Sequence, residues 1–150
     1  MKNKLDKLSV EILLCLQENA RASYADIGRK VGLTSPAVAE RIKKMEDLGI
    51  IEGYNVNISY SQLGYQLTAM VTLRAFVGKL KPFLEHVKSF EEVRNCYRIT
   101  GNENIIMEVV IRDQKHLETF IDKLIVYGEA RTHIVLSNVV SNQLLTRIKK

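Results

Sequence analysis

The feature that most constrains this chain is the stretch from Ser23 to Gly49, which has the pattern of two short amphipathic helices joined by a turn. Ile27 begins the apolar side of the first helix, Gly32 ends that helix, and Leu33 fills the corner. The apolar residues of the second helix recur at helical spacing at Val38, Ile42 and Met45. The pattern predicts a helix-turn-helix, a motif that presents its second helix to the major groove of DNA.

The second helix has a defined start and a predicted outer face. Thr34 or Ser35 can cap it, and Pro36 fits the first turn, which needs no backbone donor. Small residues lead on the outer face and charged residues follow, so the helix can approach base edges while basic side chains reach bases or phosphates. The residues expected to bind DNA are Thr34, Ser35, Pro36, Ala37, Glu40, Arg41, Lys43 and Lys44.

The alternative interpretation of this helix is a solvated charged face. In that case its basic residues pair with acidic residues one turn away, at Glu40, Glu46 and Asp47. A lone basic helix favours this alternative. The preceding helix and turn favour DNA binding instead.

Composition agrees with a small two-part protein. The 150 residues are 46% hydrophobic and 26% charged, enough to bury one good core or two small ones. The net charge of +5 suits a polyanionic partner, although residues 1–60 hold nine basic and eight acidic side chains, so bulk charge does not point to the helix-turn-helix. No apolar run approaches the roughly 20 residues of a membrane span, and none follows the N-terminal lysines. We therefore expect no membrane contact and a cytoplasmic, nucleoid-associated location.

No residue pattern indicates catalysis or a metal site. Cys15 and Cys96 lie far apart without metal or redox spacing, and we expect both to be buried thiols. His86, His116 and His133 fall in separate predicted elements, and no paired-carboxylate or Ser-His-Asp pattern accompanies them. We therefore expect neither enzyme activity nor a bound metal or cofactor.

The segments around the motif complete an N-terminal domain over residues 1–53. Leu5, Leu8, Ile12 and Leu16 form one helical stripe, with Asp6 or Ser9 at its N-terminal end. After Gly49, residues 50–58 have the pattern of a short hydrophobic strand with a turn, typical of a winged variant. Residues 54–66 are expected to form a linker strand or hinge.

From Leu67 the hydrophobic period changes from helical to two. The expected elements are, in order, a strand at 67–75, a helix at 80–87, strands at 93–99 and 105–111, a helix capped by Asp113 and ended by Gly128, and a strand at 133–140. The order βαββαβ predicts a ferredoxin-like sandwich over residues 67–150, with both helices on one face of an antiparallel sheet.

The other face of that sheet also carries apolar residues. Ile106 and Val110 oppose Ile105, Met107, Val109 and Ile111, while Val135 and Val139 oppose Ile134, Leu136 and Val140. An identical sheet is the simplest cover for such a face, and a helix-turn-helix normally needs two copies to read two half-sites. A homodimer is therefore expected, the alternative being a single domain with scattered surface hydrophobes.

The two halves together resemble a known family. Tyr24–Gly28, Glu40–Glu46 and Cys96–Gly101 stand in an order and spacing similar to those of the leucine-responsive and asparagine-type (Lrp/AsnC) transcriptional regulators. The resemblance extends from about Leu5 to Leu144. It implies an α+β fold, with a (winged) helix-turn-helix domain followed by a ferredoxin-like, RAM-type βαββαβ domain, and it adds Tyr24 to the expected DNA-binding residues.

The resemblance also implies a function. Family members regulate transcription by binding specific double-stranded DNA, dimerise through the C-terminal sheets, and often form tetramers or octamers. Their effectors are amino acids or related metabolites, bound between dimers near the loop that here comprises Thr100, Gly101, Asn102, Glu103 and Asn104. Family members often have an aspartate and an aromatic residue after this glycine, where the chain has Asn102 and Glu103.

Two other functions remain open from the sequence. One is an architectural protein that wraps DNA, responds to no small molecule and reads deformability more than base edges. The other is a metabolic enzyme or amino-acid-binding module carrying an unrelated N-terminal unit, against which the absence of an acid/base pattern argues.

Overall fold

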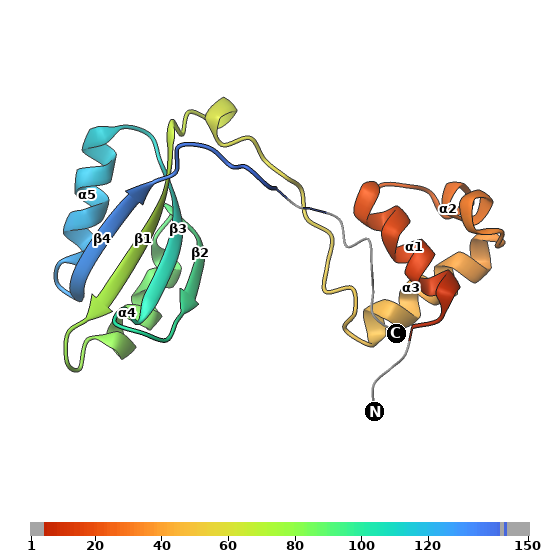
Figure 1. Cartoon of the computed structure of the whole chain (residues 1–150), viewed down its shortest axis with the longest axis horizontal. Coiled ribbons are helices and arrows are strands. Elements are labelled where there is room, and N and C mark those ends of the chain that lie inside the picture. The colour runs from red at the N-terminus through yellow and green to blue at the C-terminus, as the bar shows by residue number, and fades with distance from the viewer. Residues whose placement is uncertain (1–4, 142, 144–150) are drawn as a thin grey trace. The chain divides into compact units, whose positions relative to one another are not determined.

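The computed structural model describes residues 5–141 and residue 143. The chain forms two compact units, of which the first extends to Asn57 and the second comprises Ile58–Val139 (Figure 1). Among the described residues, no helix combines the length and apolar character needed to cross a membrane.

The N-terminal unit contains three helices, α1 (Lys7–Glu18), α2 (Tyr24–Val31) and α3 (Ser35–Asp47) (Figure 1). A polar residue precedes each helix and accepts a hydrogen bond from a first-turn amide, satisfying a donor that the helix itself leaves free. These residues are Asp6, Ser23 and Thr34. Gly32 ends α2 at a φ of 73°, in the left-handed region. The predicted helix, turn and helix are confirmed.

The three helices share one small core. Its buried residues are Ile12, Leu16, Ile27, Val38, Ile42 and Met45, which confirms the predicted inward face of α3. Gly28 is buried beside the turn, where an added Cβ would lie 2.4 Å from the Leu33 carbonyl oxygen. Close passage of α2 past the turn therefore requires a glycine at this position.

The predicted winged strand after α3 is wrong. Among the described residues, no part of 50–58 forms a strand. The amides of Ile50 and Ile51 instead donate to the Met45 carbonyl oxygen at 2.9 and 3.2 Å, and both side chains pack against the helical core. Residues 52–59 are exposed and have no helix or strand. A strand needs a neighbour to satisfy its backbone, and none of the described residues supplies one here.

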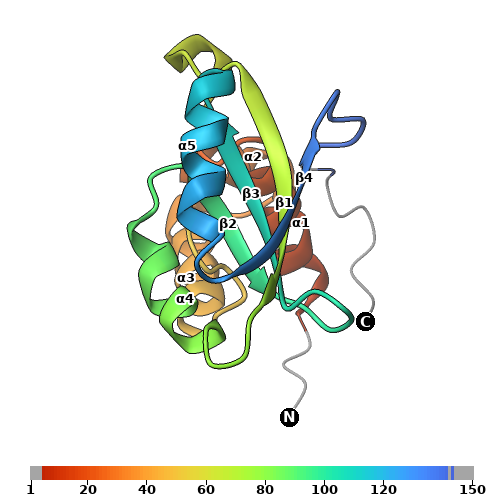
Figure 2. The same cartoon turned by 90° about the vertical axis from the view of Figure 1, so that its left-hand side faces the viewer.

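The second unit is built on a four-stranded antiparallel sheet in the order β2-β3-β1-β4. Its elements are β1 (Leu67–Ala75), α4 (Leu80–His86), β2 (Val93–Arg98), β3 (Ile105–Ile111), α5 (Gln114–Leu124) and β4 (Gly128–Ile134), with short 3₁₀ turns at Ser61–Leu63 and Val87–Ser89. Figure 2 shows α4 and α5 on the same face of the sheet. The predicted ferredoxin-like βαββαβ fold is confirmed.

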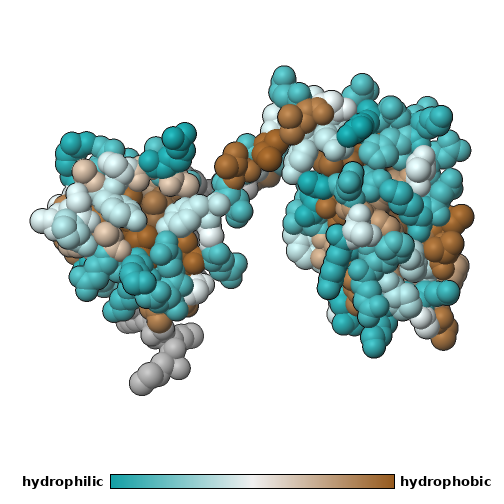
Figure 3. Space-filling view, turned by 180° about the vertical axis from the view of Figure 1, so that it is seen from behind, coloured by the Kyte–Doolittle hydropathy of each residue, from teal (hydrophilic) through white to brown (hydrophobic). Residues whose placement is uncertain are grey.

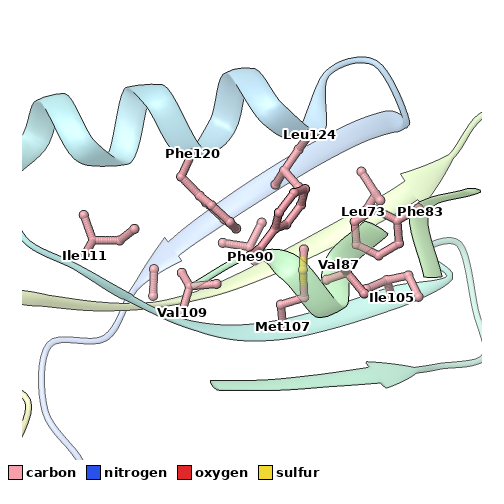
Figure 4. Packing of buried hydrophobic residues seen from close by; sticks show 12 residues of the cluster. Leu73, Phe83, Val87, Phe90, Ile105, Met107, Val109, Ile111, Phe120 and Leu124 are labelled. Carbon is pink, nitrogen blue, oxygen red and sulfur yellow. The ribbon is translucent and has the colours of Figure 1, made fainter. Parts of the chain in front are cut away.

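The core of this unit lies between the sheet and its two helices. Alternate residues of β1 and β3 point into it, as the period of two predicts. Phe120 and Leu124 of α5 face Val109 and Met107 of β3 across this layer (Figure 4). Phe90 contacts Phe120 edge to face, with ring centroids 6.1 Å apart.

The predicted position of the last strand is wrong by several residues. α5 ends at Leu124, and β4 begins at Gly128 and ends at Ile134. Beyond it, the Val135 amide still donates to the Thr68 carbonyl oxygen at 2.9 Å. The antiparallel register places residue 136 opposite Leu67, the first residue of β1, so the chain beyond 136 has no partner on this strand. Leu136, Val139 and Val140 are exposed and are not part of the sheet.

The face of the sheet opposite the helices is mixed rather than apolar throughout. Ile106 and Val110 point to this face, as predicted, and Met70 lies on it beside them. Polar residues surround them at Thr68, Thr72, Asn95, Glu108, Arg131 and His133. In the space-filling view from behind, hydrophilic residues cover most of the visible surface of this unit, with separate hydrophobic patches among them (Figure 3). We refer to this surface below as the open face.

Candidate functional site

The outer face of α3 carries most of the residues expected to bind DNA. Pro36, Glu40, Lys43 and Lys44 are exposed, as is the capping residue Thr34. Ser35 and Ala37 are half-buried in the first turn. The helix therefore presents a small, uncharged N-terminal turn followed by two lysines, a surface that can enter a groove and meet phosphates.

The two lysines differ in their surroundings. Lys43 Nζ lies 3.6 Å from Asp47 Oδ1, and both side chains are largely exposed. An ion pair of this kind contributes little and is readily exchanged for a phosphate. Lys44 makes no ion pair within the described residues and lines a groove of about 470 Å³ between the start of α1 and α3.

The predicted outward position of Arg41 is wrong. Its Nη1 donates to Asp6 Oδ1 at 2.9 Å, to Asp6 Oδ2 at 2.6 Å and to Ser9 Oγ at 3.0 Å. The side chain is 30% exposed. Arg41 directly precedes the buried Ile42, so it lies on the flank that faces α1 instead of the outer face. The hydrogen bond from Arg41, followed by that from Ser9, lowers the pKa of Asp6 to about 2.

Two tyrosines of the N-terminal unit, Tyr24 and Tyr54, lie outside α3. Tyr24 begins α2 and is 47% exposed. Tyr54 lies beyond α3, and its hydroxyl donates to Glu46 Oε1 at 2.8 Å. Burial and this hydrogen bond raise the pKa of Tyr54 to about 12. This hydrogen bond links the last turn of α3 to the segment that follows the helix.

The loop expected to bind an effector is tied closely to β1. The backbone amide of Asn104 donates to the Leu73 carbonyl oxygen, and the side-chain Oδ1 of Asn104 accepts from the backbone amide of Ala75 at 2.8 Å. Gly101 has a φ of 118°, in a region that L side chains rarely adopt. Asn104 is therefore committed to holding the loop, while Thr100 and Gly101 are exposed.

The charged residues beside this loop already pair with one another. Glu103 Oε1 lies 3.4 Å from Arg131 Nη1, and Arg74 donates to Glu129 at 2.8 Å. With Asn102 they line a cavity of about 50 Å³, which has room for little more than one water. The cavity that Asn102 and Glu103 help to line is therefore too small for an amino acid.

Glu92, His116 and Lys123 form a buried polar cluster that the sequence did not predict. The Glu92 side chain is 5% exposed, and its Oε1 accepts from Lys123 Nζ at 2.6 Å and from His116 Nε2 at 3.2 Å. Burial raises the pKa of Glu92, but the hydrogen bonds, led by that from Lys123, outweigh it and leave the pKa below its ordinary value. No local pattern indicates this cluster, because Glu92 lies just before β2 whereas His116 and Lys123 lie on α5.

Cys15 and Cys96 are half-buried rather than buried, and burial raises the pKa of the Cys96 thiol. No group of three or more His, Cys, Asp or Glu side chains that could hold a metal ion occurs in the part of the chain that the structure describes.

Comparison with known proteins identifies both units. Residues 5–46 match the AsnC-type helix-turn-helix domain, and residues 68–145 match the Lrp/AsnC ligand binding domain. The chain belongs to the Lrp/AsnC family. It is a DNA-binding transcriptional regulator that carries the family's ligand-binding domain.

Relatives and solved structures agree with this assignment. The HTH-type transcriptional regulator YezC of Bacillus subtilis is 36% identical over 134 residues, which cover 89% of this chain and 95% of the relative. The structure of B. subtilis LrpC has a TM-score of 0.87 at 27% identity and covers 92% of this chain and 99% of its own. That of Escherichia coli AsnC has a TM-score of 0.84 at 27% identity, over 94% and 98%.

A regulator from Neisseria meningitidis, solved in complex with L-methionine, has a TM-score of 0.88 over 95% of this chain and 96% of its own. Its identity is 24%, so the likeness concerns the fold.

Proposed function

We propose that this Lrp/AsnC regulator binds specific double-stranded DNA through the outer face of α3, as a homodimer assembled through the sheet unit, under the control of an amino acid. The proposal assigns residues 1–53 to DNA binding, 54–66 to the connection and 67–150 to assembly and ligand binding. It assigns the chain no enzymatic reaction, metal or cofactor, and it includes association with the nucleoid.

The observation that carries the DNA-binding assignment is the presentation of α3. Its start is fixed by Thr34 and Pro36, and its exposed face continues to Lys43 and Lys44. Ala37 lets the first turn approach base edges, and the lysines serve as phosphate contacts. Tyr24, Ser35 and Glu40 complete the proposed surface, while Arg41 holds α3 in position through Asp6.

The open face supports assembly. Met70 and Ile106 are half-buried there, although no helix of the unit covers this side of the sheet. A second copy would cover them, and the threonines and charged residues around them provide a polar rim. Two copies also supply the two recognition helices that a two-half-site operator needs. A tetramer or octamer would add further contacts between dimers.

The effector part of the proposal concerns the ligand-binding domain and the loop from Thr100 to Asn104. The L-methionine complex of the Neisseria regulator supports an amino acid as the ligand class. Because the cavity beside the loop is only about 50 Å³, the loop can hold an amino acid only with residues from a neighbouring copy.

Footprinting on genomic DNA, with and without each common amino acid, tests DNA binding and control together. We expect protected sites with paired half-sites, and at least one amino acid that changes the protection. The double variant Lys43→Ala/Lys44→Ala should lose protection while keeping its circular dichroism spectrum. Unchanged protection by that variant would remove α3 from the role of reader.

Sedimentation of the full chain tests assembly. The parent should sediment as a dimer or larger species, and Ile106→Lys on the open face should shift it toward the monomer. Ile125→Lys is the matched control, because Ile125 is exposed outside the sheet. Equal sedimentation of both variants and the parent would argue against the open face.

The architectural alternative makes a different footprint. A protein that wraps DNA should protect a long region with a period near one helical turn and show no amino-acid dependence. Short paired sites favour the regulator that we propose.

A further inference from the structure

A second cavity lies in the sheet unit, away from the loop at Thr100–Asn104. Its volume is about 380 Å³, against about 50 Å³ at the loop. It lies where β2 begins, β3 ends and α5 makes its first turn, and Tyr65 and Thr119 form part of its wall. All its lining residues lie in the sheet unit, and the cavity is large enough to hold a small ligand without a neighbouring copy.

Glu92 lines this cavity, and one oxygen of its buried carboxylate is unused. Both resident donors, Lys123 Nζ and His116 Nε2, are directed to Oε1. His116 Nδ1 accepts from the Arg112 amide at 3.1 Å, which assigns the ring proton to Nε2. Glu92 Oε2 is buried and has no hydrogen-bond partner within the described residues. Such an acceptor is costly to leave unpaired, so the site lacks one donor.

The rest of the wall supplies groups of the opposite charge. Arg112 and Lys115 are exposed at the cavity, and the Arg112 guanidinium stacks over the Tyr65 ring at 5.3 Å from its centroid. Two further acidic groups, Glu91 and Asp113, also line it. The mixture does not suit a simple anion. It suits a molecule that carries an ammonium and a carboxylate a few bonds apart.

We propose that this cavity binds a free amino acid, with its ammonium donating to Glu92 and its carboxylate held by Arg112 or Lys115. The inference rests on the proposed function for the class of ligand but places a site outside the loop. A ligand there would link the ends of β2 and β3 to α5, stabilising the sheet unit when bound.

Thermal unfolding and calorimetric titration of the full chain with each of the twenty L-amino acids test the site. Thr119→Trp fills the cavity without changing its charge, and Glu118→Trp is the matched control because Glu118 is exposed on the same helix and does not line the cavity. We expect at least one amino acid to raise the midpoint of unfolding of the parent. Thr119→Trp should weaken its binding at least tenfold, and Glu118→Trp should leave it unchanged.

Charge variants then test the chemistry. Lys115→Ala and Glu92→Gln should each weaken binding of the same amino acid. Ethylamine and propionate, which carry only one of its two charged groups, should each bind more weakly than the amino acid. Since Glu92→Gln also alters the pairing with Lys123, Thr119→Trp decides the matter if the glutamine variant unfolds at a lower temperature.

The outcomes separate this site from the proposed function. Binding that survives Thr119→Trp but is lost in Gly101→Trp would overturn the inference and leave effector control at the loop. If none of the twenty amino acids binds at millimolar concentration, both the cavity site and control by an amino acid are overturned. DNA recognition by α3 is tested separately by footprinting and would not be affected. Binding of propionate or phosphate as tight as that of any amino acid would reduce the cavity to an anion site.

Discussion

The two units of this regulator are stabilised by different means. Twelve buried residues form the cluster of the sheet unit, whereas six form that of the N-terminal unit. The smaller core is supplemented by polar ties, chiefly Arg41 with Asp6 and Ser9, and Tyr54 with Glu46. Polar side chains that look available for DNA can therefore be structural in a small domain. Loss of DNA binding by a variant of this unit must be separated from loss of its fold.

The strongest test of this contrast is Ile42→Asp. Ile42 is 2% exposed in the smaller core, and an aspartate there buries an unpaired charge. We expect a loss of about 4 kcal/mol or more, enough to unfold the N-terminal unit while the sheet unit keeps its own transition. Amide NMR spectra would show the two units separately. The control is Lys43→Asp at the exposed neighbouring position, which should remain folded and bind DNA more weakly. Unfolding of both units in Ile42→Asp would contradict their independence.

Gly28→Ala tests the close passage of α2 past the turn. Alanine is normally better than glycine in a helix by roughly 1 kcal/mol. Here its Cβ would meet the Leu33 carbonyl oxygen at 2.4 Å, and backbone cannot move aside. We expect a net destabilisation of about 1–3 kcal/mol, measured by urea unfolding. Gly53→Ala, with open space around it, should be nearly neutral; similar results for the two variants would argue against the steric account.

Lys44→Ala and Arg41→Ala separate a DNA contact from a structural tie. Loss of a phosphate contact at Lys44 should weaken binding similarly on all sequences and lower the salt slope of the affinity by about one. Its unfolding curve should match the parent. Arg41→Ala should lower the unfolding midpoint of the N-terminal unit as well, because Asp6 and Ser9 lose their partner. Equal stability of the two variants would contradict the structural role of Arg41 and leave its side chain available to bind DNA.

The smallest expected effect is the pH dependence of the Asp6 tie. The folded pKa of Asp6 is about 2, below its ordinary value of 3.8. The folded state therefore favours the carboxylate, so this contribution to stability is complete above about pH 4 and is lost as the pH falls toward 2. Asp6→Asn should flatten this part of the profile, measured by urea unfolding between pH 5 and 2. Arg41→Ala should flatten it in part, because the hydrogen bonds from Ser9 to Asp6 remain. An unchanged slope in both variants would contradict the assignment.

The sequence predicts best where local period and partners agree. The bounds of β1 follow from its alternating pattern, and those of β3 from an apolar run between a turn and the helix cap at Asp113. Both are central strands with neighbours on each side. The start of α5 follows from Asp113, whose side chain accepts from the His116 amide. In these elements the local signal and the tertiary environment favour the same structure.

Two strand predictions failed because a strand is defined by its partner. Residues 135–140 include three valines, yet β1 begins at Leu67 and has no residues left to pair with those beyond 136. The polar segment from Gly128 to His133 lies along β1 instead and forms most of β4. Gly128 fits because its Cα passes close to the Arg74 backbone, where an added Cβ would lie 2.2 Å from the carbonyl oxygen. Pairing and close approach are not visible in the hydrophobic pattern.

The candidate site divides in the same way. Helical period places Lys43 and Lys44 on the outer face of α3, and the structure agrees. The partner of Arg41 lies 35 residues away, and those of Glu92 lie 24 and 31 residues away. Contacts at such separations depend on the packing of whole elements, so no local spacing could indicate them.

The strand order has a consequence for how the chain is made. β1 pairs on one side with residues 105–111 and on the other with residues 128–134, so the centre of the sheet cannot close until the last strand has left the ribosome. The buried core of the three N-terminal helices is formed by residues between Ile12 and Met45. Local contacts form faster than distant ones, and domains fold as they emerge. The helical unit should therefore be folded during synthesis, while the sheet waits for its final strand.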